Sequence, residues 1–111
     1  SIRERQMAWA YLFTASAAEI VWAYTLKASD GFTRPLWSVV NLVAMLATVW
    51  FLAQAVRTLP LGTAYAVWTG VGVVGAAALG VLFMGEALSP LRLGAIALIL
   101  TGVLMLKLAE G

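Results

Sequence analysis

One residue stands out among those whose chemistry could serve a function, because Glu19 is the only ionisable side chain well inside an apolar stretch. A charge held inside a membrane costs at least about 2.5–3.5 kcal/mol on insertion scales, so such a carboxylate is by default a functional candidate. Helical spacing places Ser16 and Trp22 on the same face as Glu19. A carboxylate next to aromatic rings suits a small organic cation, because the rings add cation–π attraction.

Two later stretches carry polar and aromatic residues at helical spacing. Asn41 and Thr48 fall on one stripe, and Tyr65, Trp68, Thr69 and Gly72 share a face further along the chain. Trp68 lies away from the ends of its apolar stretch, where membrane-anchoring aromatics usually sit, and a buried Tyr65 hydroxyl needs a partner. We therefore expect one site for proton and substrate at Glu19, with a pocket formed by Ser16, Trp22, Thr48, Tyr65 and Trp68.

The glycines Gly70, Gly72 and Gly75 have the spacing of a dinucleotide-binding loop. That loop requires a strand before it, a helix after it and a second strand to complete the parallel unit. Here the flanking residues form one continuous apolar stretch, and another follows it. The pattern thus favours helix packing and effectively excludes a nucleotide-binding enzyme.

Composition indicates an integral membrane protein. Of the 111 residues, 63% are hydrophobic and 11% charged, against roughly 25% charged in a soluble domain, and the mean hydropathy is +0.96. Charges are absent over stretches that match the roughly 20 residues of a membrane-spanning helix. We predict an all-α protein with four transmembrane helices over about 7–26, 36–56, 62–84 and 90–108. Residues 1–6 are expected to be a native extension or a segment left by cloning, and 109–111 a short tail.

The residue types that the chain lacks argue against enzymes, metal sites and nucleic-acid binding. It has no histidine and no cysteine, which removes the commonest general base and the usual metal ligands. Its net charge of +2 is too small and too scattered for a nucleic-acid surface. We therefore expect a transporter rather than an enzyme, with no catalytic residue, no cofactor, no metal and no nucleic-acid partner.

The basic residues are balanced between the two ends of the predicted helices. The face with both termini has Arg3, Arg5, Arg57 and Lys107, and the opposite face has Lys27, Arg34 and Arg92. An orientation is normally fixed by an excess of such residues on the cytoplasmic side. The balance is compatible with a short protein that simply has few charges, and also with a chain that inserts both ways round and pairs as an antiparallel dimer.

Self-association is expected because one four-helix chain can hardly enclose a transport pathway. Gly72, Ala76 and Gly80 form a stripe of small residues, which allows close approach of helices. Gly94 and Gly102, with Thr101, form a weaker stripe in the last apolar stretch. We expect these positions to serve helix packing or the dimer.

Three stretches carry a resemblance to a known family: AEIVWAYTLKASDGFTR (18–34), RTLPLGTAYAVWTGVGVVGAA (57–77) and GEALSPLRL (85–93). They resemble the small multidrug resistance family over nearly the whole chain from Met7. The closest similarity is to its guanidinium exporter subtype, because Trp22 follows Glu19 by one turn. The resemblance implies an antiparallel, dual-topology dimer of four-helix subunits.

The resemblance also implies roles for single residues. Glu19 resembles the family's essential carboxylate, and Trp22, Tyr65 and Trp68 match the aromatic residues of its pocket. Thr48 stands where comparable exporters have a serine that hydrogen-bonds the carboxylate, and its extra methyl group bears on the width of the pocket. Lys27 and Arg92, at helix ends, are expected to anchor the chain in the membrane.

The function expected from these observations is proton-coupled antiport that exports guanidinium and small guanidinyl compounds across the cytoplasmic, inner membrane. The expected partners are a second copy of the chain, the cation, protons and the lipid bilayer; a related chain as the second subunit stays open. Two other functions remain as alternatives. One is a broad exporter of quaternary ammonium and aromatic cations in the same family, and the other is a membrane assembly subunit in which Glu19 docks a partner helix.

Overall fold

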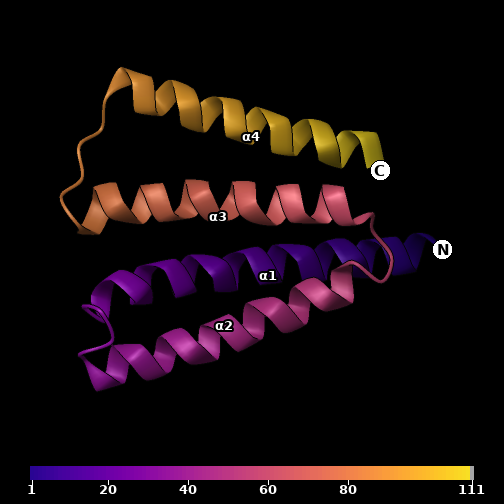
Figure 1. The fold of residues 1–111 in the computed structure, drawn as a ribbon. Helices are drawn as coiled ribbons and strands as arrows, with labels where there is room; N and C mark the ends of the chain where they lie inside the picture. Colours follow the sequence, from indigo (N-terminus) through magenta and orange to yellow (C-terminus); the bar gives the residue numbers. More distant parts are fainter. Residues whose placement is uncertain (111) are drawn as a thin grey trace.

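The structure is a computed structural model that describes residues 1–110 and consists of four helices joined by short loops (Figure 1). These are α1 (Ile2–Ala28), α2 (Pro35–Ala55), α3 (Leu61–Phe83) and α4 (Pro90–Glu110). No strand occurs among the described residues. The expected all-helical architecture is therefore confirmed, and a strand-based nucleotide site has no place in residues 1–110.

The helices run alternately up and down, so both termini and the α2–α3 loop lie at one end of the subunit (Figure 1). α1 is the central element: it packs extensively against α2 and also along α3, whereas α2 and α3 barely touch. α4 packs mainly against α3, and Val103 is its one buried residue. Near the termini it also touches α1, where Lys107 lies over the Trp9 ring and the Arg5 guanidinium donates to the Glu110 carbonyl. The face of α4 turned away from α3 is thus left without a partner in the subunit.

Proline and a serine cap define where the helices begin. Pro35 and Pro90 are first residues of α2 and α4, and Pro60 caps α3, in agreement with the tolerance of a first turn for proline. α1 begins earlier than the first apolar stretch, because the Ser1 hydroxyl accepts a hydrogen bond from the Glu4 amide at 3.2 Å. This serine–glutamate spacing is a helix-start signal, and it makes most of residues 1–6 helical.

Three of the four helices are long and apolar enough to cross a membrane, namely α2, α3 and α4, each with a mean hydropathy of 2.0. α1 is long enough but more polar, because it carries Glu19 and several hydroxyl and aromatic side chains. Its place between α2 and α3 keeps part of this polar surface away from lipid (Figure 1). The helix with the candidate carboxylate therefore has a neighbouring helix on each of two sides.

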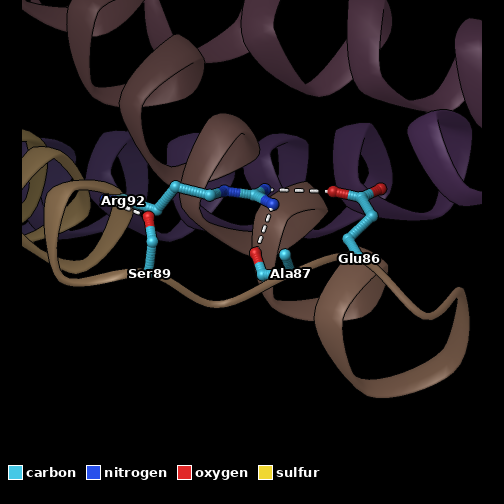
Figure 2. Close-up of polar contacts among 4 residues, drawn as sticks. All are labelled: Glu86, Ala87, Ser89 and Arg92. Atoms are coloured by element: carbon cyan, nitrogen blue, oxygen red, sulfur yellow. Dashed lines mark hydrogen bonds and ion pairs between the residues drawn. The ribbon is translucent and has the colours of Figure 1, made fainter.

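The loop between α3 and α4 is folded back on itself by Arg92. Its guanidinium donates to Glu86 Oε1 at 3.0 Å and to the Ala87 carbonyl at 2.6 Å, and its amide donates to the Ser89 hydroxyl (Figure 2). Arg92 therefore closes this loop, a role beyond the membrane anchoring expected from the sequence.

Candidate functional site

Glu19 lies on the side of α1 that faces α3, and its carboxylate is directed at the backbone of Gly72. A Cβ atom at Gly72 would stand 2.5 Å from Cδ and Oε1 of Glu19 and 2.7 Å from Oε2. These separations are far inside the 3.5–4.0 Å of ordinary contact between heavy atoms. The missing side chain of Gly72 is therefore what makes room for the carboxylate between the two helices.

One oxygen of this carboxylate has no hydrogen-bond partner. Glu19 is half-buried, yet its Oε2 is fully buried and accepts no hydrogen bond from any residue that the structure describes. A buried polar atom without a partner is costly and rare in native proteins. A hydrogen-bond donor for Glu19 Oε2 therefore has to come from outside the described subunit.

Thr48 of α2 ties α1 and α3 together beside this carboxylate. Its hydroxyl donates to the Ala15 carbonyl at 2.6 Å and accepts the Trp68 indole N–H at 2.8 Å. A hydroxyl has a single proton to donate, so Thr48 has none left for Glu19. The resemblance implied a hydroxyl bonded to the carboxylate at this position, whereas in the subunit Thr48 fixes Trp68 instead.

Ser16 makes no bond to Glu19 either. It is fully buried one turn before Glu19, and its hydroxyl donates to the Leu12 carbonyl of its own helix at 2.9 Å. Hydroxyls in membrane helices often bond the carbonyl four residues earlier in this way. The Ser16 hydroxyl is thus bonded within α1 rather than to the carboxylate.

The structure brings two of the three expected aromatic residues together. The Tyr65 and Trp68 rings on α3 are 5.4 Å apart at an interplanar angle of 52°. Trp68 is half-buried and held by Thr48, but Tyr65 is 54% exposed on the subunit surface. Tyr65 is therefore available to a second subunit or to a ligand, rather than to the interior of its own.

Trp22 follows Glu19 by one turn of α1 and is half-buried. Its carbonyl accepts the Asn41 side-chain N–H at 2.7 Å, and the same amide group donates to the Thr25 hydroxyl at 3.1 Å. Asn41 is 1% exposed and joins α2 to the end of α1 beyond the carboxylate. The sequence analysis did not assign it a role, although an asparagine on the Thr48 stripe of an apolar helix was a signal for it.

A second residue without an assigned role is Thr69, which shares the Gly72 face of α3. Its hydroxyl oxygen is buried and has no hydrogen-bond partner among the described residues. The sequence placed Thr69 on this face but could not show that its hydroxyl is left unbonded.

Besides Gly72, three glycines of α3 lie close to side chains of other elements. A Cβ at Gly75 would run into the Ile20 side chain of α1, and one at Gly70 would stand 2.7 Å from a methyl group of Val103 on α4. Gly80 faces the Glu86 carboxyl group of the following loop. The glycines whose spacing resembles a dinucleotide-binding loop thus lie within α3 and allow close contact with α1 and α4.

The remaining small residues of the predicted packing stripes lie nearer the surface. Ala76 is half-buried on α3. Gly94 and Gly102 on α4 have open space where a Cβ would be added. Their use in a dimer contact stays a prediction.

Taken together, the candidate residues present a carboxylate and aromatic rings from a single subunit. The subunit offers one carboxylate whose buried oxygen has no hydrogen-bond partner among the described residues, the Trp68 indole held by Thr48, and the exposed Tyr65. Such an arrangement can bind a proton or a small cation and requires no covalent chemistry.

Comparison with known proteins agrees with this chemistry. The family described as Small Multidrug Resistance protein matches residues 7–111. A guanidinium exporter of Yersinia pseudotuberculosis is 52% identical over 104 residues, which are 94% of this chain and all of that protein. Guanidinium exporters of Citrobacter freundii and Escherichia coli are 50% and 48% identical over 103 residues, 93% of this chain and 98% of each relative.

The match covers all four helices and the residues around Glu19, and it identifies a membrane transporter rather than an enzyme. The four-helix subunits of this family pair as dual-topology homodimers, as the resemblance implied and as the balanced charges allow. The chain belongs to the small multidrug resistance family.

Proposed function

We propose that this chain is a proton-coupled antiporter that exports guanidinium and small guanidinyl compounds across the cytoplasmic membrane. The observation that carries the proposal is the buried Glu19 Oε2, which accepts no hydrogen bond from the part of the chain that the structure describes. A guanidinium ion presents parallel N–H groups that match the two oxygens of a carboxylate. The relatives named guanidinium exporter, about half identical to this chain, support the same substrate.

Exchange of protons for guanidinium follows from competition for the Glu19 carboxylate. A carboxylate that holds a proton cannot also form the paired ionic hydrogen bonds with guanidinium, so each species displaces the other. In an antiparallel dimer two Glu19 residues, one from each subunit, would line a shared site near the middle of the bilayer. Guanidinium binds the deprotonated carboxylates from the cytoplasm, and protons from the other side release it after the site changes the face to which it opens.

The aromatic residues would hold the cation from the sides. The Trp68 indole N–H donates to Thr48 of α2, so little rotamer freedom is lost when a cation stacks on this ring. Trp22 lies one turn from Glu19 on α1. Tyr65, exposed on the single subunit, would face the pocket from the partner's side. These roles remain proposals that mutation can separate.

Transport by the purified homodimer in proteoliposomes tests this function. We expect an inward guanidinium gradient to produce a current on a supported membrane, and Glu19→Gln to abolish it, because glutamine keeps the shape but binds neither a proton nor a cation electrostatically. Tetrapropylammonium serves as the second substrate, since it carries charge but no N–H donor. We expect much smaller currents with it.

The other outcomes separate the alternatives. Currents with tetrapropylammonium but none with guanidinium would identify a broad exporter of quaternary cations. A folded dimer that is silent with both cations, together with dissociation of the Glu19→Gln protein, would favour an assembly subunit. Guanidinium currents that persist in Glu19→Gln would contradict the role proposed for the carboxylate.

A further inference from the structure

Thr69 differs from the other hydroxyl residues inside the helices. Within the described chain, the hydroxyls of Thr14, Ser16, Thr25, Ser38 and Thr101 donate to a carbonyl of their own helix. Thr48 donates to a neighbouring helix and Thr63 to the Glu110 carboxylate. The Thr69 hydroxyl oxygen is buried and has no hydrogen-bond partner in residues 1–110. It has not taken the intrahelical bond that such residues usually form.

The position of Thr69 relates it to the carboxylate. α1 and α3 run in the same direction (Figure 1), and Glu19 lies against Gly72. Thr69 precedes Gly72 by three residues, so it shares that face of α3 and lies about 4.5 Å along the axis from the level of Glu19. Among the described residues, three buried side-chain polar atoms have no partner, and two of them, Glu19 Oε2 and Thr69 Oγ1, are therefore on facing helices about one turn apart; the third is Trp9 Nε1.

We infer that the Thr69 hydroxyl is a substrate-binding group that accepts an N–H of the cation held by Glu19. A planar guanidinium has N–H groups that point in several directions, so one ion can donate to the carboxylate and to a hydroxyl one turn away. The free hydroxyl would then select for cations that carry N–H donors. This inference rests on the proposed function and adds a residue to its site.

Substitutions that separate the hydroxyl from the volume of the side chain test this role. Thr69→Val keeps the size and removes the hydroxyl, whereas Thr69→Ser keeps the hydroxyl and removes the methyl group. We expect Thr69→Val to weaken equilibrium binding of guanidinium to the purified dimer by about 10-fold or more, because a hydrogen bond to a charged donor is lost. We expect Thr69→Ser to bind within about threefold of the unmodified protein.

A purely structural role predicts the reverse order, since valine fills the same space and serine leaves a gap. Thr14→Val is the matched control, because Thr14 is an exposed threonine on α1 that donates to the Ala10 carbonyl of its own helix. If Thr69→Val does not form a folded dimer, the comparison of Thr69→Ser with Thr69→Ala isolates the same hydroxyl. Unchanged guanidinium binding by Thr69→Val would overturn the inference. So would equal weakening by Thr69→Val and Thr69→Ser, or by Thr69→Ser and Thr69→Ala.

Failure of this inference can be told apart from failure of the proposed function. If the unmodified protein does not bind guanidinium, the substrate is wrong and the Thr69 inference falls with it. If the unmodified protein binds guanidinium and Glu19→Gln does not, while Thr69→Val binds normally, only the role of Thr69 is refuted.

Discussion

Replacing Gly72 by alanine would place a methyl group against the carboxylate of Glu19. The added Cβ would lie 2.5 Å from Cδ and Oε1 of Glu19, whereas non-bonded heavy atoms rest at about 3.5–4.0 Å. Glu19 must therefore retreat by about 1 Å, or α1 and α3 must separate by a similar distance. Either response moves the carboxylate from the position in which it meets the substrate.

The size of the effect follows from the hydrogen bonds at stake. A displacement of this order removes one of the two paired N–H bonds from guanidinium, and a bond to a charged group contributes about 1.5–3 kcal/mol. We therefore expect Gly72→Ala to weaken guanidinium binding by about 10- to 100-fold. Helix stability should not be the cause, because alanine favours a helix over glycine by about 1 kcal/mol.

Gly80→Ala is the matched control on the same helix. A methyl group there also meets a carboxyl group, that of Glu86, but Glu86 lies on a loop and its side chain is 45% exposed. It can move into solvent at little cost, so we expect guanidinium binding to stay within about twofold of the unmodified protein. The comparison separates crowding at the candidate site from crowding in general.

Isothermal titration of guanidinium into both purified dimers measures the two affinities. Binding by Gly72→Ala within about twofold of the unmodified protein, with Glu19→Gln still inactive, would refute the reasoning. It would show that the exact place of the carboxylate beside Gly72 does not matter for binding.

Two further substitutions test the contacts around the site. Thr48→Val should lower the free energy of unfolding by about 1–3 kcal/mol, because it leaves the Trp68 N–H and the Ala15 carbonyl without the Thr48 hydroxyl. Thr48→Ser keeps that hydroxyl and should unfold with nearly the free energy of the unmodified protein. Denaturation in detergent compares the two variants, and equal losses of stability would contradict the bridging role. Arg92→Gln breaks an exposed ion pair with Glu86, so we expect a stability loss of at most about 1 kcal/mol and nearly unchanged guanidinium transport. Loss of transport in a folded dimer would show that the α3–α4 loop takes part in transport.

The helices could be predicted from the sequence because apolarity and proline positions determine them directly. The stretch expected over 62–84 is α3 at Leu61–Phe83, and the last span begins at Pro90 as expected. The start of α1 was missed, since the apolar pattern begins at Met7 whereas the helix depends on a local bond between Ser1 and Glu4. A capping pattern in polar residues carries no hydropathy signal, so hydropathy alone could not reveal it.

The candidate site was only partly predictable. Glu19 stood out because a lone carboxylate in an apolar stretch is costly and needs a reason. Its contact with Gly72, and the bond of Thr48 to Trp68, depend on how far each helix is rotated about its axis, and spacing within one helix does not fix that rotation. The unbonded hydroxyl of Thr69 likewise follows from packing between α1 and α3.

The most direct measurement is the release of protons when guanidinium binds to the purified dimer. Titration at neutral pH, in buffers of different ionisation enthalpy, counts the protons that leave with each bound cation. We predict net proton release from the unmodified protein, and neither binding nor release in Glu19→Gln, because proton and guanidinium share one carboxylate. Tight guanidinium binding with no proton released at any pH near neutrality would contradict a shared site and, with it, the coupling of export to protons.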